Sequence, residues 1–265
     1  MSLIRKPLKV YGEFYRQLKD KKATFEVKET SYTKRIKIGK NTIMFADTPM
    51  NPIELKLINL IRSSANTFDV PELEENTPQI AFYKFYDIHE EKEFKGVKID
   101  LNEAYWQTAI NLGVVTPAIQ FYFTENQEKL GSEKSIKMAR LRSLGALATK
   151  RTIKSVENGI LIDETLDVNE QHRQLYLYIC EQVAEVMHNV ACEFMQHVKY
   201  YYWDCIFLDD KVDIKEVNKK IIELGYRSKL EGQGDYKIIK GQYMSYLHDV
   251  AKNVRYPIRN SDLIN

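Results

Sequence analysis

The chain has 265 residues, enough for one large domain or two small ones. Hydrophobic residues make up 44% of it and charged residues 29%, which are ordinary values for a soluble globular protein. The net charge of +2 gives no global signal for binding nucleic acid.

Cysteine usage and hydropathy predict a cytoplasmic protein. Cys180, Cys192 and Cys205 form no CxxC pair and indicate no disulfide framework, which fits a reducing compartment. No apolar run approaches the roughly 20 residues that a membrane-spanning helix needs. The charged N-terminus lacks the apolar core of a signal peptide. We therefore expect a location in the cytoplasm and no membrane partner.

Residues 1–78 are predicted to form a small N-terminal α/β region that is basic. The first forty residues hold many more lysines and arginines than acidic residues, and this excess fits either phosphate neutralisation or a solvated terminal segment. A hairpin is expected from 33–40 and 42–46, and a short helix over 51–64. The acidic stretch 69–78, with two prolines, is predicted to be a linker.

Residues 79–265 are predicted to form a second domain of the α+β class, in which helices pack on one face of a largely antiparallel sheet. Its expected strands are 80–88, 95–101, 119–123, 160–163, 199–208, 226–229 and 236–239. Its expected helices run from 102 to about 113, from Ser132 as the cap to about 158, from 171 to 197, and from 214 to 224.

Two aspartates occupy strand positions that favour chemistry. Asp100 ends the predicted strand at 95–101, just before a helix. Asp204 lies within the aromatic stretch YYYWDCIFL, where an unpaired buried carboxylate would cost several kcal/mol or take up a proton. If their strands are neighbours, the two carboxylates would hold Mg²⁺ for phosphoryl or nucleotidyl transfer. Alternatively, Asp100 caps the following helix and Asp204 belongs to a salt bridge.

The residues around both aspartates resemble a known family. DLNEAYW, at 100–106, resembles motif A of family B DNA polymerases, and WDCIF, at 203–207, resembles motif C. The resemblance spans roughly residues 80–240 and implies a compact, divergent palm domain with a reduced fingers helix at about 132–158, of a type found in phages or mobile elements. It implies that Asp100 and Asp204 are catalytic and bind Mg²⁺ or Mn²⁺, with the backbone of Leu101 completing the metal shell.

The resemblance also implies contacts to substrates. Tyr105 would be the steric gate that excludes a 2′-hydroxyl, and Lys229 would contact the DNA primer. The triphosphate would be held by Lys137, Arg140 and Arg142, unless their segment is simply an exposed basic helix. The implied partners are a primer–template DNA and a deoxynucleoside triphosphate, with other replication proteins, in the cytoplasm of a bacterial host if a phage encodes the chain.

The sequence also departs from both motifs. Tyr202 replaces the first aspartate of motif C and Cys205 replaces its serine, while Glu103 brings a negative charge to where a triphosphate would lie. Three alternatives to a DNA polymerase therefore stay open. They are a catalytically inactive palm that binds DNA or assembles a replisome, a primase or template-independent terminal transferase, and a structural or regulatory protein whose aspartates are incidental.

Overall fold

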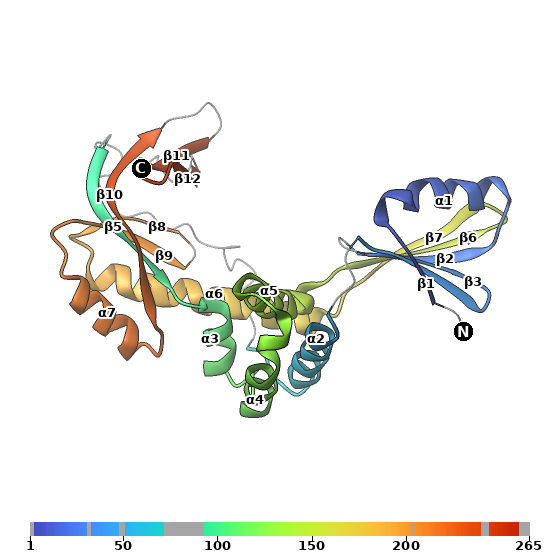
Figure 1. The fold of residues 1–265 in the computed structure, drawn as a ribbon, viewed down its shortest axis with the longest axis horizontal. Helices are drawn as coiled ribbons and strands as arrows, with labels where there is room; N and C mark the ends of the chain where they lie inside the picture. Colours follow the sequence, from blue (N-terminus) through green and yellow to red (C-terminus); the bar gives the residue numbers. More distant parts are fainter. Residues whose placement is uncertain are drawn as a thin grey trace. The chain divides into compact units, whose positions relative to one another are not determined.

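A computed structural model describes residues 3–30, 33–47, 51–71, 93–202, 204–239 and 244–259. The chain forms two compact units, each made of two separate chain segments (Figure 1). Unit 1 comprises Met1–Val70 and Thr116–Tyr176, and unit 2 comprises Pro71–Val115 and Leu177–Asn265. The α+β class is as predicted. The chain does not divide at residue 78, because residues 116–176 belong with the N-terminal segment.

Unit 1 contains a sheet of six strands in the order β1-β4-β3-β2-β6-β7. The strands are β1 (Leu3–Lys6), β2 (Phe25–Glu29), β3 (Lys34–Ile38), β4 (Asn41–Phe45), β6 (Arg151–Glu157) and β7 (Ile160–Asp167). Only the β1–β4 pair in this described sheet is parallel. The hairpin of β3 and β4 confirms the prediction, and the pairing of β2 with β6 joins the two segments of the unit.

Helix α1 (Tyr11–Asp20) covers one face of this sheet, as Figure 1 shows. Its aromatic side chains Tyr11, Phe14 and Tyr15 pack against a core that includes Val27 and Phe45. This helix was not predicted from the sequence because most of its exposed positions are charged, although its apolar residues repeat every three to four positions. A short 3₁₀ turn, η1 (Leu8–Val10), precedes it.

A polar cluster also ties α1 to the sheet. The hydroxyl of Tyr11 donates a hydrogen bond to Glu29, whose carboxylate lies 3.5 Å from Lys34 and 3.3 Å from Lys154. Burial alone would raise the pKa of Glu29, but this hydrogen bond and the two lysines outweigh burial and lower it. Glu29 is therefore held in its ionised form in the folded chain.

Besides the start of α6 (Glu170–Glu193), unit 1 contains three further helices: α2 (Pro52–Ala65), α4 (Pro117–Asn126) and α5 (Glu133–Gly145). Helix α2 confirms the prediction for 51–64, with Asn51 accepting the amide of Ile53 at 2.9 Å as its cap. The strand predicted at 119–123 is wrong. Thr116 caps a helix there and Pro117 occupies its first position, and these start signals outweigh the strand preference of the aromatic residues.

The long helix predicted from 133 to 158 is also wrong in its second half. Ser132 caps α5 as expected, by accepting the amide of Ser135 at 3.2 Å, but α5 ends at Gly145. The chain then enters the β6–β7 hairpin, whose turn is Asn158-Gly159 with φ of 49° and 79°. An Asn-Gly pair favours this tight turn because both residues tolerate positive φ. Short 3₁₀ turns follow α4 and α5, at η2 (Gln127–Leu130) and η3 (Ala146–Ala148).

Unit 2 contains a second sheet, in which all strand pairs are antiparallel, in the order β12-β11-β10-β5-β9-β8. The strands are β5 (Glu93–Leu101), β8 (Val198–Tyr202), β9 (Cys205–Asp209), β10 (Ser228–Ile239), β11 (Met244–Asp249) and β12 (Val254–Arg259). The helices are α3 (Ala104–Asn111), α6 (Glu170–Glu193, of which the part from Leu177 belongs to this unit) and α7 (Ile214–Glu223). β5, β8, β9 and β10 with the intervening helices form a split β-α-β arrangement.

Several predicted boundaries in unit 2 change. The strand predicted at 199–208 is a hairpin of β8 and β9, with Asp204 in the connection. The two strands predicted at 226–229 and 236–239 are one strand, β10, with a bulge between Leu230 and Gly232. The predictions for β5, α3, α6 and α7 are confirmed within a few residues. The strand predicted at 80–88 lies outside the described residues, and β11 and β12 were not predicted.

The two faces of this sheet differ. Because successive residues of a strand point to opposite faces, Ile99 and Leu101 of β5 contact the helix side, where Val190 of α6 and Ile221 of α7 complete one core. Figure 1 shows α6 and α7 on this side. The other face holds a second cluster, made of Phe94, Tyr200, Cys205, Phe207, Tyr236 and Leu247, which contains no residue of a described helix. No helix among the described residues is long and apolar enough to cross a membrane.

Candidate functional site

Asp100, near the end of β5, and Asp204, in the connection directly before β9, lie at the same end of two neighbouring strands. Asp100 of β5 is the register partner of Cys205 of β9. The backbone amide of Leu101 donates a hydrogen bond of 2.8 Å to the carbonyl oxygen of Asp204. The strands next to the two aspartates are therefore neighbours, as the predicted magnesium site requires. Asp100 does not act as the N-cap of α3, because Glu103 occupies that position.

The buried thiol of Cys205 lies within the fields of both carboxylates. Burial raises the pKa of Cys205, the charge of Lys98 opposes this, and Asp100 and Asp204 raise it further. A thiol in this environment stays protonated at neutral pH and is a poor metal ligand. The oxygen atoms of the two aspartates are therefore the groups that suit a hard cation such as Mg²⁺.

Lys98 brings a fixed positive charge to the same face, two residues before Asp100. Its Nζ lies 2.6 Å from Glu231 Oε2 and 4.8 Å from the centroid of the Tyr256 ring. Burial alone would lower the pKa of Lys98, but the hydrogen bond and the negative charge of Glu231 act against burial, and the pKa is raised overall. Lys98 and Glu231 were missed in the sequence analysis. The period-2 spacing of Lys98 from Asp100 was the available signal.

The structure brings three further predicted residues to unit 2. Lys229 of β10 is the register partner of Asp100, and its exposed Nζ lies 3.7 Å from Glu231 Oε1. Tyr105 lies in the first turn of α3, half-buried, and packs against the core on the helix side. The side chain of Leu101 is buried in that core. Lys229 therefore shares the strand-end region and the sheet face of Asp100, whereas Tyr105 and the side chain of Leu101 pack on the helix side.

Glu103, the departure from motif A, is exposed and has a left-handed backbone, with φ of 57° and ψ of 36°. A non-glycine residue in this region costs of order 1 kcal/mol and is concentrated at functional or tightly constrained positions. The strain follows from the sharp connection between β5 and α3. It sets the direction in which α3 leaves the strand that carries Asp100.

The predicted triphosphate-binding cations, Lys137, Arg140 and Arg142, lie on α5 in unit 1 and not in the unit of the aspartates. Arg142 Nη1 lies 3.5 Å from Glu54 Oε1 of α2. The guanidinium of Arg140 lies 5.6 Å from the centroid of the Phe123 ring of α4. Lys137 is exposed. The contacts of both arginines join helices of unit 1 to one another.

Four of the N-terminal cations lie on the face of the unit 1 sheet opposite α1, which we call the basic face (Arg5, Lys28, Arg35 and Lys37). Lys28 is the register partner of Arg35, and Arg35 and Lys37 point the same way on β3. Arg5 and Arg35 share one register partner on β4. All four side chains are exposed, and Glu26 of β2 is a carboxylate on the same face. Part of the charge excess of the sequence therefore lies on folded strands, while Arg16 and Lys19 lie on α1.

Among the described residues, no group of three or more histidine, cysteine, aspartate and glutamate side chains is arranged to hold a metal ion. The candidate site consists of two carboxylates, Asp100 and Asp204, whose backbones are neighbours. Mg²⁺ is commonly bound through one or two carboxylates, with water and substrate phosphates as its other ligands, so the pair fits this ion. Comparison with known protein-family models gave no match, and neither did comparison with curated proteins.

Proposed function

We propose that the chain catalyses Mg²⁺-dependent nucleotidyl transfer, in which deoxynucleotides are added to the 3′-hydroxyl of DNA as by a DNA polymerase. The observation that carries this proposal is the adjacency of Asp100 and Asp204 at the ends of neighbouring strands. The position of Lys229, an exposed cation that is the register partner of Asp100 on the same sheet face, supports the proposal. The split β-α-β topology is compatible with it, but a fold of this kind hosts many functions and carries no weight alone.

In such a reaction Asp100 and Asp204 would bind the metal ion that stabilises the transition state. The 3′-oxygen attacks the α-phosphorus, the bond to pyrophosphate breaks, and negative charge develops on the transferred group. A bound Mg²⁺ would supply charge neutralisation and activation of the 3′-hydroxyl, held by the carboxylates of Asp100 and Asp204. Lys98 keeps a positive charge on the same face, and Lys229 offers an exposed cation to a DNA phosphate.

The test is extension of a labelled primer–template by the purified chain with Mg²⁺ or Mn²⁺. Asp204→Asn removes one metal-binding charge, and loss of about 3–5 kcal/mol of transition-state stabilisation corresponds to a fall of roughly 10²–10⁴-fold in rate. Asp210→Asn is the matched control, because Asp210 is an exposed residue beyond the other end of β9. Extension that survives in Asp204→Asn at the rate of Asp210→Asn rules out the proposed site.

A second candidate function is a catalytically inactive palm that binds DNA. Two observations favour it. Glu103 presents an exposed negative charge two residues after the end of β5, and the two α5 arginines make contacts within unit 1. This candidate predicts tight DNA binding, with no extension of duplex, single-stranded or unprimed DNA under any nucleotide set. A binding assay run beside the extension assay separates the two.

A further inference from the structure

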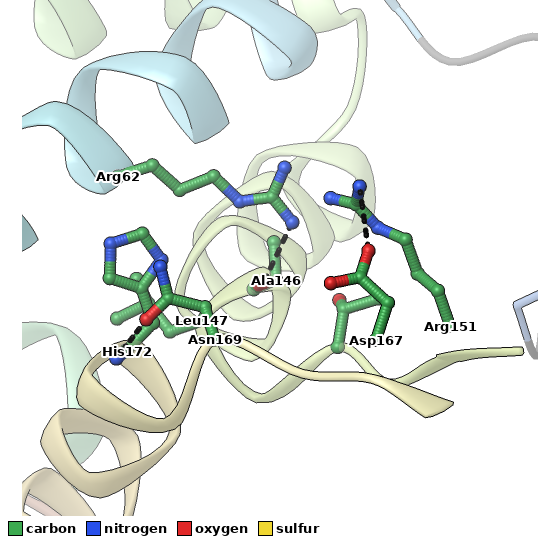
Figure 2. Close-up of a pocket in the computed structure, with 8 residues that line it drawn as sticks. Arg62, Ala146, Leu147, Arg151, Asp167, Asn169 and His172 are labelled. Carbon is green, nitrogen blue, oxygen red and sulfur yellow. Dashed lines mark hydrogen bonds and ion pairs between the residues drawn. The ribbon is translucent and has the colours of Figure 1, made fainter. Parts of the chain in front are cut away.

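A cavity of about 220 Å³ lies within unit 1, and none of the residues of the candidate site lines it (Figure 2). It is formed where α2, the loop after η3, the β6–β7 hairpin and the start of α6 come together. Its polar lining residues are Arg62, Thr149, Arg151, Asp167, Asn169 and His172. Two cations and three neutral hydrogen-bonding side chains therefore surround one carboxylate.

The two arginines face each other across this cavity, as Figure 2 shows. Arg62 Nη2 donates a hydrogen bond of 2.8 Å to the carbonyl of Ala146, which fixes the position of the guanidinium. Within the described ranges, no carboxylate forms an ion pair with Arg62. Arg151 Nη1 lies 3.7 Å from Asp167, whose side chain is 49% exposed. Two guanidinium charges are thus balanced by one partly solvated carboxylate.

The electrostatics of the cavity are those of uncompensated positive charge. Burial lowers the pKa of Arg62, and the charge of Arg151 lowers it further. Burial also lowers the pKa of His172, and Arg62 adds to this effect. An anion placed between the arginines would relieve their repulsion.

The start of α6 adds a second attraction for an anion. The helix begins at Glu170 and has 24 residues, and the side chain of Asn169 accepts the amide of His172 at 3.0 Å as its cap. The amide end of a helix carries partial positive charge. The Nε2 nitrogen of the His172 ring donates a hydrogen bond of 2.8 Å to Asn66 Oδ1.

We infer that this cavity binds a terminal phosphate group. Arginine forks match phosphate oxygens in bidentate geometry, and a terminal phosphate offers three oxygens to two arginines, whereas a phosphodiester offers two unbridged ones. Pockets for whole drug-sized ligands start at about 300 Å³, so this cavity suits the phosphate and part of what it is attached to. The inference does not rest on the proposed nucleotidyl transfer.

The phosphate has two chemical sources, which are a free phosphorylated small molecule and the phosphorylated end of an oligonucleotide. Calorimetric titration of the full chain with inorganic phosphate, pyrophosphate, and a 5′-phosphorylated oligonucleotide beside its 5′-hydroxyl form distinguishes them. Saturable binding of phosphate and pyrophosphate supports a small-molecule source. Binding of the phosphorylated oligonucleotide that is tighter than both, and lost in the 5′-hydroxyl form, supports a nucleic-acid end.

Arg151→Gln is the test variant and Lys150→Gln is its matched control, since Lys150 is exposed, adjacent in sequence and absent from the cavity lining. Loss of one charged hydrogen-bonding partner predicts phosphate binding that is weaker by about 10- to 100-fold in Arg151→Gln. Lys150→Gln should bind as the unsubstituted chain does. Equal weakening in both variants, or no saturable phosphate binding to the unsubstituted chain, overturns the inference.

The ring of His172 provides a readout in the unsubstituted chain. Arg62 of α2, Arg151 of β6 and Asp167 of β7 are the charged groups that line the cavity with it. A bound phosphate places negative charge near the ring, so the pKa of His172, followed by NMR, should rise when phosphate is added. In Arg151→Gln, about 10- to 100-fold more phosphate should be needed for the same shift. An unchanged His172 titration in the unsubstituted chain at saturating phosphate contradicts binding at this cavity.

Discussion

Replacing Glu231 with glutamine is expected to destabilise unit 2 more than replacing Lys98 with methionine does. The two side chains form an ion pair of 2.6 Å, but Lys98 is 7% exposed and Glu231 is 28% exposed. Glu231→Gln leaves a buried ammonium against the rings of Tyr256 and Phe207. Lys98→Met leaves a carboxylate that reaches solvent and still lies 3.7 Å from Lys229. The costs of the two substitutions are therefore unequal.

The magnitudes follow from burial. Removing one partner of a fully buried pair costs about 3–5 kcal/mol. Glutamine keeps a carbonyl oxygen within reach of Lys98, and the position is partly solvated, so we expect about 2–3 kcal/mol for Glu231→Gln. Lys98→Met removes the buried ion and keeps an unbranched apolar chain, so its cost should stay below about 1 kcal/mol. A loss of 2–3 kcal/mol corresponds to a fall of roughly 4–12 °C in melting temperature.

Urea unfolding followed by tryptophan fluorescence measures the change in unfolding free energy of unit 2, because both tryptophans of the chain fall within its residue ranges. Lys229→Met, at a side chain that is 65% exposed, is the control and should change stability little. The double variant Lys98→Met/Glu231→Gln should resemble Lys98→Met. A larger loss in Lys98→Met than in Glu231→Gln would refute the reasoning, because it would mean that the burial of the ammonium is not what makes the pair costly to break.

Two further predictions concern unit 1. If the basic face binds DNA, Arg35→Gln/Lys37→Gln should reduce the salt dependence of duplex binding by about 1.8 in the slope of log affinity against log salt, since each lost phosphate contact contributes about 0.9. Arg16→Gln/Lys19→Gln on α1 is the control, and an equal change there would show that only net charge matters. The lowered pKa of Glu29 stabilises the fold above its ordinary value of 4.5, and this stability is lost as pH falls through the lowered value. Glu29→Gln should therefore show a weaker loss of stability in acid unfolding monitored by circular dichroism, and an unchanged acid transition would contradict this.

The sequence predicted the elements whose signals are local. Helix α2 was recognisable from its cap Asn51 and its apolar period, and β5 from its alternation before Asp100. The aromatic segment 119–123 was assigned to a strand because strand preference was weighed above the Thr-Pro start of a helix. The Asn158-Gly159 turn was the missed signal for the β6–β7 hairpin, which was assigned to the helix after Ser132.

The candidate site was predictable in part. Adjacency of Asp100 and Asp204 was expected if their strands paired, and the register of β5 with β9 brings them together. Two other features of the site could not be predicted from the sequence. The bulge in β10 that accompanies the Glu231–Lys98 contact depends on pairing between residues far apart in the chain. The separation of Arg140 and Arg142 from the unit of the aspartates depends on the pairing of β2 with β6. The polymerase resemblance itself stays a prediction.

The interleaving of the two units has a consequence for synthesis of the chain. Strand β2 is complete at residue 29, but its partner β6 begins at residue 151, so one edge of β2 stays without its native neighbour until more than half of the chain has been made. An unpaired strand edge attracts other strands and promotes aggregation. A fragment cut at residue 78 would keep that bare edge permanently. No single cut separates the two units. To express each unit alone, its two chain segments must be joined directly, in their native or in a permuted order.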